Sequence, residues 1–172
     1  YTFHFSIQVF FYQYLDSYKN RFSEFYHEGL DLRGKTGTPV KALILCKVIA
    51  YGWYSTYGQV VFLSKKNDVG IYMIAHLSEY DSDIYVGKEY LPGETVGYVG
   101  ASGKKDGKYD LNAWKNPHLH ITYYDYEYLE DKIVNSDNGE ILFKGNIQSI
   151  LINSRANPFY HDSEKRKPNK EL

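Results

Sequence analysis

Two histidines stand two residues apart in the stretch "KNPHLHITYY", at His118 and His120. The residue types around them are typical of a β-strand. Side chains two residues apart in a strand point to the same side and lie about 6–7 Å from each other. Such a pair could be half of a metal site, a catalytic pair or two surface residues, and the spacing alone does not decide between these.

Three further residues are of the kinds that bind metals or move protons: His27 and Asp31 in "YHEGLDL", and His76 in "YMIAHLSEY". A catalytic zinc site takes three nitrogen, sulfur or carboxylate ligands and leaves a fourth position open. In a straight strand, His27 and Asp31 would be about 13 Å apart, too far to share one ion. Gly29 disfavours a helix but permits a bend that would bring the two side chains together.

The elements that must position these residues are predicted to be mostly β. Residues 1–11 alternate between apolar and polar types, as a half-buried strand does, and residues 12–26 are expected to form a loop. "KKND" and "LPGE" predict tight turns, and the glycines and charges of residues 102–117 predict a loop. Further short strands are predicted at Val40–Ala50, Gln59–Ser64, Gly70–Leu77, Glu94–Val99 and His118–Tyr126.

Composition excludes several classes of protein. The net charge of −1 argues against a nucleic-acid binder and against adsorption to an anionic membrane. No apolar run approaches the roughly 20 residues that span a bilayer, so no membrane span is expected in this chain, although an anchor could lie upstream of Tyr1. The single cysteine, Cys46, cannot form an internal disulfide and is best explained as a small buried apolar residue.

Five motifs occur in an order that closely resembles the lysostaphin/LytM-type zinc metallopeptidases, which are bacterial peptidoglycan endopeptidases. They are H-x-G-x-D (27–31), G-T-P-V (37–40), A-H-L-S (75–78), "PGETVGYVGASG" (92–103) and P-H-L-H (117–120). The resemblance implies a mostly β fold: a single antiparallel, β-barrel-like domain of the LytM (duplicated hybrid motif) type with a central substrate groove. We expect residues 1–25 to be an N-terminal strand and connecting segment, 26–128 the zinc peptidase core, and 129–172 a C-terminal extension with a charged tail.

The resemblance also implies a role for each site residue. His27, Asp31 and His120 would bind Zn²⁺, and His76 and His118 would be the catalytic pair. All five positions are filled, whereas non-catalytic relatives have lost zinc ligands. This chain departs from the family pattern at Asn116, where glycine is common, and in its longer loop before Pro117.

The expected function is zinc-dependent cleavage of peptidoglycan cross-links or stem peptides, with a histidine as general base for a zinc-activated water. We assign the base to His118, with His76 stabilising the oxyanion or holding the water, although the sequence alone does not decide which of the two histidines is the base. If the strand continues in register, Tyr124 and Tyr126 share the face of His118, and they are candidate substrate contacts, as is Trp114 in the preceding loop.

The alternative function is a non-catalytic module of the same fold that binds cell wall or regulates another wall hydrolase. In either case the expected location is the bacterial periplasm, the cell envelope or the extracellular space. A regulatory protein partner could hold the site shut. The sequence leaves open whether the scissile bond lies in a D-amino-acid cross-link or in a glycine bridge.

Overall fold

The computed structural model describes residues 30–65, 71–124, 133–135, 139–143 and 155–156. The predicted strand at residues 1–11, the loop at 12–26, the turn at "KKND" and the charged tail lie wholly or mainly outside these residues. Among the described residues no helix has the length and apolarity needed to cross a membrane.

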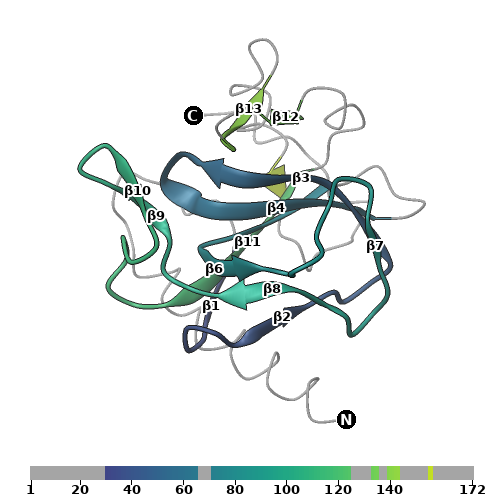
Figure 1. Ribbon diagram of the computed structural model, residues 1–172. Coiled ribbons are helices and arrows are strands. Elements are labelled where there is room, and N and C mark those ends of the chain that lie inside the picture. The colour runs from purple at the N-terminus through teal and green to yellow at the C-terminus, as the bar shows by residue number, and fades with distance from the viewer. Residues whose placement is uncertain (1–29, 66–70, 125–132, 136–138, 144–154, 157–172) are drawn as a thin grey trace, which may run out of the picture.

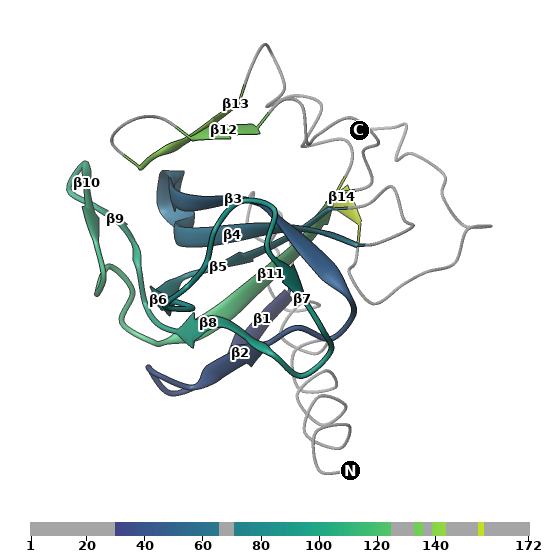
Figure 2. The same ribbon diagram turned by 45° about the vertical axis from the view of Figure 1, so that its right-hand side comes forward.

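The main element of the fold is a seven-stranded antiparallel sheet, which curves through the molecule (Figures 1 and 2). Its strands are β1 (Leu30–Arg33), β3 (Cys46–Tyr54), β4 (Gly58–Lys65), β5 (Ile71–Ala75), β7 (Glu89–Tyr90), β11 (His118–Tyr124) and β14 (Arg155–Ala156). Their order is β1–β11–β5–β4–β3–β7, and β14 pairs with β11. A short 3-10 helix, η1 (Ser55–Tyr57), joins β3 to β4. The predicted mostly β fold is therefore confirmed.

A smaller sheet and two hairpins complete the described structure (Figure 1). The small sheet has the order β2–β8–β6, and its strands are β2 (Pro39–Lys41), β8 (Thr95–Val99) and β6 (Leu77–Tyr80). One hairpin consists of β9 (Gly103–Lys105) and β10 (Lys108–Asp110), and the other of β12 (Ile133–Asn135) and β13 (Ile141–Phe143).

Two apolar clusters cover the two faces of the large sheet, which explains the unbroken apolar run Val60–Leu63 in β4. A strand that is buried on both faces needs apolar residues at every position. The inner core comprises Val40, Ala42, Cys46, Val48, Val61, Leu63, Ile74, Leu77, Tyr90, Val96, Val99, Leu119 and Ile121. The outer core comprises Ala50, Val60, Phe62, Ile71, Met73, Ala75, Tyr124, Ile133 and Ile141.

The C-terminal strands belong to the same packing unit as the large sheet. Both β12 and β13 contact β3, and β14 pairs with the end of β11. Ile133 and Ile141 are buried in the outer core. The described parts of the C-terminal extension thus cover a sheet face, while the boundaries 1–25, 26–128 and 129–172 stay predictions.

Two predicted strands are wrong in the same way, because each crosses from one sheet to the other. The run Val40–Ala50 is divided between β2, in the small sheet, and β3, in the large one. The run Gly70–Leu77 is interrupted at His76, between β5 of the large sheet and β6 of the small one. Apolar residues flank both crossings, because Ala42 and Cys46 at the first, and Ile74 and Leu77 at the second, are buried in the inner core. Composition therefore does not mark the break.

Two predicted connections had different outcomes. The tight turn at "LPGE" is confirmed, since the amide of Glu94 donates to the carbonyl of Leu91 at 3.1 Å and Gly93 has a φ of 93°. The loop predicted for residues 102–117 is more ordered than expected, because it contains the β9–β10 hairpin. Tyr109 of this hairpin packs on Trp53 of β3, with ring centroids 4.9 Å apart.

Candidate active site

Asp31 and His120 lie directly opposite each other across the β1–β11 pair. Side chains of directly paired residues emerge on the same face of a sheet. The imidazole Nδ1 of His120 donates a hydrogen bond to Oδ1 of Asp31 at 2.8 Å. Strand pairing therefore brings together two predicted zinc ligands that are 89 residues apart in the chain.

Thr122 holds the His120 ring from its other side. Its hydroxyl Oγ1 lies 2.7 Å from Nε2 of His120, and both side chains are buried. A hydroxyl can either donate or accept, so Thr122 can satisfy Nε2 in either tautomer of the imidazole. Both ring nitrogens of His120 are thus held by side chains, which fixes the orientation of the ring.

His118 is oriented by the backbone just before its strand. Its Nδ1 donates to the carbonyl oxygen of Asn116 at 2.8 Å. Because a carbonyl oxygen only accepts, Nδ1 carries the proton, and in the neutral ring Nε2 has the lone pair. Nε2 lies 4.0 Å from Oδ1 of Asp31. The basic nitrogen of His118 therefore faces the Asp31–His120 pair.

His76 occupies the crossing between the two sheets with a φ of 60°, a backbone conformation that non-glycine residues seldom adopt. Its Nδ1 donates to the carbonyl of Ser102 at 2.8 Å, and its amide donates to the carbonyl of Tyr57 at 3.0 Å. Burial lowers the pKa of His76 to about 4, although the Ser102 carbonyl opposes this shift. The ring is consequently neutral at pH 7, with its lone pair on Nε2.

The three histidine rings form one cluster. The centroid of His76 lies 4.5 Å from that of His118 and 5.9 Å from that of His120. These rings and Asp31 come from β1, from the β5–β6 crossing and from β11. Four of the five residues predicted to bind metal or move protons are therefore brought together. The fifth, His27, lies outside the described residues.

Sequence reasoning missed Tyr57, which also borders the cluster. Its ring centroid lies 5.2 Å from that of His120 and 6.3 Å from that of His76. Burial, with smaller contributions from Tyr54 and Asp31, raises the pKa of Tyr57 to about 12, so its hydroxyl keeps its proton at neutral pH. In a chain with 19 tyrosines, no spacing signal singles out this one.

Gly58 allows a close approach between the end of η1 and Ser102, whose carbonyl binds the His76 ring. A Cβ at this position would lie 2.3 Å from the carbonyl carbon of Ser102, and φ is 69°. Ser102 is fully buried, and its hydroxyl accepts a hydrogen bond from the amide of Gln59 at 3.0 Å. Glycine is therefore needed at position 58, because a side chain there would displace the carbonyl that orients His76.

The three candidate substrate contacts fall into three situations. Trp114 is 46% exposed and its ring lies 5.5 Å from His76 and 6.1 Å from His118, so it stays a candidate at the rim. Tyr124 is only 1% exposed and its hydroxyl points to Sδ of Met73 at 3.9 Å, so it is a core residue and not a peptide-facing one. Tyr126 lies outside the described residues.

The donors that meet in this site are of the types that zinc takes. Oδ1 of Asp31 and Nδ1 of His120 face each other, and Thr122 supports the histidine as an outer-shell partner would. Within the part of the chain that the structure describes, no group of three or more His, Cys, Asp or Glu side chains is placed to hold a metal ion. The pair fits a zinc site, with His27 as the predicted third ligand.

Comparison with known proteins agrees with the motifs. Lysostaphin of Staphylococcus staphylolyticus is 32% identical over 97 residues, which are 55% of this chain and 18% of lysostaphin. The L-Ala–D-Glu endopeptidase of Bacillus subtilis is 32% identical over 102 residues, which are 57% of this chain and 29% of that protein. The chain thus matches less than a third of the length of either relative.

Among solved structures, LytU superposes on 60% of this chain and 66% of its own, with a TM-score of 0.50 and 25% identity. The sequence profile of peptidase family M23 matches residues 25–136, a segment that includes every predicted zinc and catalytic residue. This match covers well over half of the 172 residues. The chain therefore belongs to peptidase family M23.

Proposed function

We propose that this chain is a zinc-dependent endopeptidase that cleaves the peptides of bacterial peptidoglycan. The observation that carries the proposal is the cluster of Asp31, His76, His118 and His120, which three separate segments bring together. Membership of a peptidase family supports a hydrolytic role for this cluster. The name of the Bacillus relative, an endopeptidase for an L-Ala–D-Glu bond, supports a wall peptide as substrate.

Asp31 and His120, together with His27, are the residues that would hold zinc. When bound, zinc acts as a Lewis acid that polarises the scissile carbonyl and lowers the pKa of water. The chain's part in binding is to keep the carboxylate oxygen of Asp31 and Nδ1 of His120 facing each other. Thr122 contributes by preventing rotation of the His120 ring.

His118 is the proposed general base. Its Nδ1 proton is held by the Asn116 carbonyl, so Nε2 is free to accept a proton from the attacking water. The protonated ring would then deliver this proton to the departing amine. His118 keeps 15% of its side chain exposed, which gives it access to substrate that the more deeply buried His120 lacks.

His76 would assist from the opposite side of the cluster. With Nδ1 bound to the Ser102 carbonyl, Nε2 of the neutral ring can accept a hydrogen bond from water and hold it in place. Because Nε2 of the neutral ring carries no proton to donate to an oxyanion, holding the water is the role we propose for His76. The substrate lies outside the cytoplasm, so we place the reaction in the cell envelope or the extracellular space.

The test is digestion of purified peptidoglycan with zinc-loaded and with chelator-treated protein, followed by mass spectrometry of the products. We expect new peptide ends only with the zinc-loaded protein, and their masses would identify the bond. If zinc-loaded protein bound peptidoglycan but released no fragments, the proposal would be wrong and the chain would be a non-catalytic binding module.

A further inference from the structure

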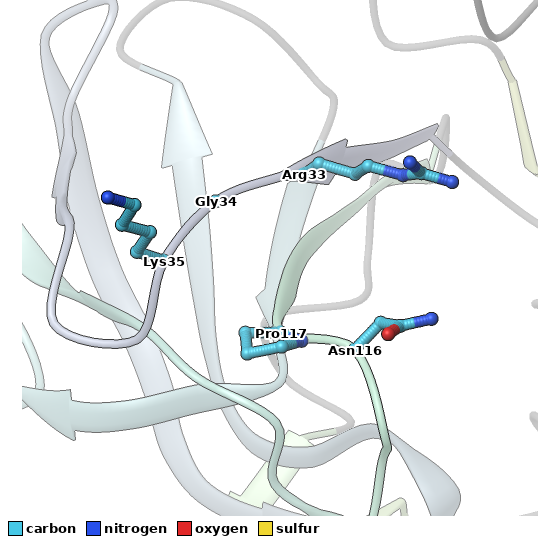
Figure 3. A pocket seen from close by; sticks show the side chains of 5 residues that line it. All are labelled: Arg33, Gly34, Lys35, Asn116 and Pro117. Atoms are coloured by element: carbon cyan, nitrogen blue, oxygen red, sulfur yellow. The ribbon is translucent and has the colours of Figure 1, made fainter.

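A pocket of about 400 Å³ lies beside the candidate active site. It is lined by Arg33, Gly34 and Lys35, at and after the end of β1, and by Asn116 and Pro117, just before β11. In Figure 3 the side chains of Arg33 and Asn116 extend to the same side of the pocket, while Lys35 lies at its opposite end. No zinc or catalytic role involves the side chains of these residues.

Residues on both sides of the pocket are linked to His118 by the backbone. Arg33 is the strand partner of His118 in the β1–β11 ladder. Asn116 supplies the carbonyl that accepts from Nδ1 of His118. Arg33 also follows Asp31 by two residues, a separation of about 6–7 Å along a strand. A group bound here would therefore sit one or two residues of an extended peptide away from the bond being cleaved.

The lining has the chemistry of a carboxylate site. The guanidinium of Arg33 and the ammonium of Lys35 are positive, the amide of Asn116 offers N–H donors, and none of the five lining residues is acidic. Arginine presents a planar fork of donors that matches a carboxylate. The chain as a whole has a net charge of −1, so this positive lining is a local feature.

Gly34 keeps the floor of the pocket close to the inner core. A Cβ at this position would come 3.2 Å from Cγ1 of Val99, closer than an ordinary contact, so a larger residue would push the β1 loop outward. Pro117 limits the backbone on the other wall. The two walls are therefore held in place by packing while the polar side chains of Arg33, Lys35 and Asn116 reach solvent.

We propose that this pocket binds a carboxylate of the substrate, one or two residues from the scissile bond. The chain would then prefer acidic stem peptides, such as those that carry a free glutamate α-carboxylate, over neutral glycine bridges. This inference rests on the proposed function, which supplies the expectation that the substrate is a peptidoglycan peptide. Carboxylate binding in the pocket can nevertheless be tested separately from hydrolysis.

The experiment compares two stem peptides that differ in one group: L-Ala–γ-D-Glu–L-Lys–D-Ala–D-Ala and the same peptide with the glutamate α-carboxylate converted to a carboxamide. Affinity is measured by fluorescence anisotropy of labelled peptides, and cleavage by mass spectrometry. We expect the carboxylate peptide to bind about 5- to 10-fold more tightly, as a charge-assisted contact at a partly exposed site would give. The preference should shrink as salt rises from about 0.05 M to about 0.5 M.

Variants identify the groups responsible. Arg33→Gln should remove most of the preference, and Lys35→Gln should reduce it about twofold, since a more distant exposed charge contributes less. Asn116→Asp keeps the backbone carbonyl that orients His118 but adds a negative charge, so it should reverse the preference toward the carboxamide peptide. Lys41→Gln removes the same charge from the small sheet, where Nζ donates to the Gly93 carbonyl, and should leave the preference unchanged.

Equal affinity for the two peptides, or a preference that survives Arg33→Gln, would overturn the inference. Cleavage of both peptides at equal rates would overturn it too, while leaving the proposed function intact. A binding preference without cleavage of either peptide would support the carboxylate site but contradict the proposed peptidase function. Displacement of the carboxylate peptide by lower concentrations of inorganic phosphate than of acetate would indicate a phosphate site and would also overturn it.

Discussion

The two faces of β11 have opposite characters although they belong to one seven-residue strand. On one face Leu119 and Ile121 are buried in the inner core. On the other face His118, His120 and Thr122 are polar, and each makes a hydrogen bond. Burial on the first face keeps the strand in register, and that register decides where the polar side chains of the second face stand. Stability and chemistry are thus separated by the alternation of a single strand.

The largest expected effect comes from removing a proton-transfer group on the polar face. His118→Ala and His76→Ala should each lower kcat/KM by about 10²–10⁴-fold, the usual contribution of a general acid or base. Zinc content, measured by atomic absorption, should stay at the wild-type level in both. His120→Ala is the matched variant that should lose zinc together with activity. Substantial activity in either of the first two variants would contradict the roles assigned here.

A substitution on the apolar face should change stability instead of chemistry. Ile121→Ala removes methyl groups from the inner core and should lower the free energy of unfolding by about 2–5 kcal/mol, measured by urea titration. The milder Ile121→Val should cost only about 1 kcal/mol. Folded protein of either variant should keep the wild-type kcat/KM. A large loss of kcat/KM in folded Ile121→Val would show that the two faces are not independent.

Thr122 tests whether a buried hydroxyl on the polar face acts through His120. Thr122→Val keeps the shape of the side chain but leaves Nε2 of His120 without its partner, and should weaken zinc affinity about 10- to 100-fold. Thr122→Ser keeps the hydroxyl and should restore most of that affinity. Zinc affinity is measured by competition with a chromogenic chelator. Equal affinities for the Val and Ser variants would exclude this positioning role.

The smallest effect is expected at Tyr124, where the polar face of β11 passes into the outer core. Tyr124→Phe removes a buried hydroxyl that lies 3.9 Å from the sulfur of Met73, a weak acceptor, and that also hydrogen-bonds with the side chain of Thr122. We expect a change in unfolding free energy below about 1 kcal/mol and no change in kcat/KM. A marked rise in KM would instead return Tyr124 to the substrate-binding surface.

The alternation around His118 and His120 was sufficient to predict a strand with both imidazoles on one side, because a side-chain period of two follows from backbone geometry. The same reasoning predicted that Tyr124 shares their face, and it does. It did not reveal that this end of the face is covered by the outer core, to which residues from β12 and β13 contribute. The burial of Tyr124 depends on elements that are distant in the sequence, so its exposure could not be inferred from β11 alone.

His76 shows a different limit. Its motif, A-H-L-S, marked it as a candidate, but the apolar residues around it predicted a continuous strand. Only the structure shows that the chain changes sheets there with a positive φ, and that the Ser102 carbonyl holds the ring. Both sides of the crossing are apolar because both sheets bury them, so the break leaves no trace in the local pattern.

The sequence by itself determined the family, the mostly β class and four residues that the fold assembles, because these depend on motif order and on short-range periodicity. Tertiary structure decided which of these residues touch, since the Asp31–His120 contact exists only through the register of two strands 89 residues apart. It also decided the supporting roles of Tyr57, Ser102 and Thr122, and it formed the pocket between Arg33 and Asn116. Such contacts depend on which strands pair and on where the chain passes from one sheet to the other. No local stretch of sequence encodes either of these.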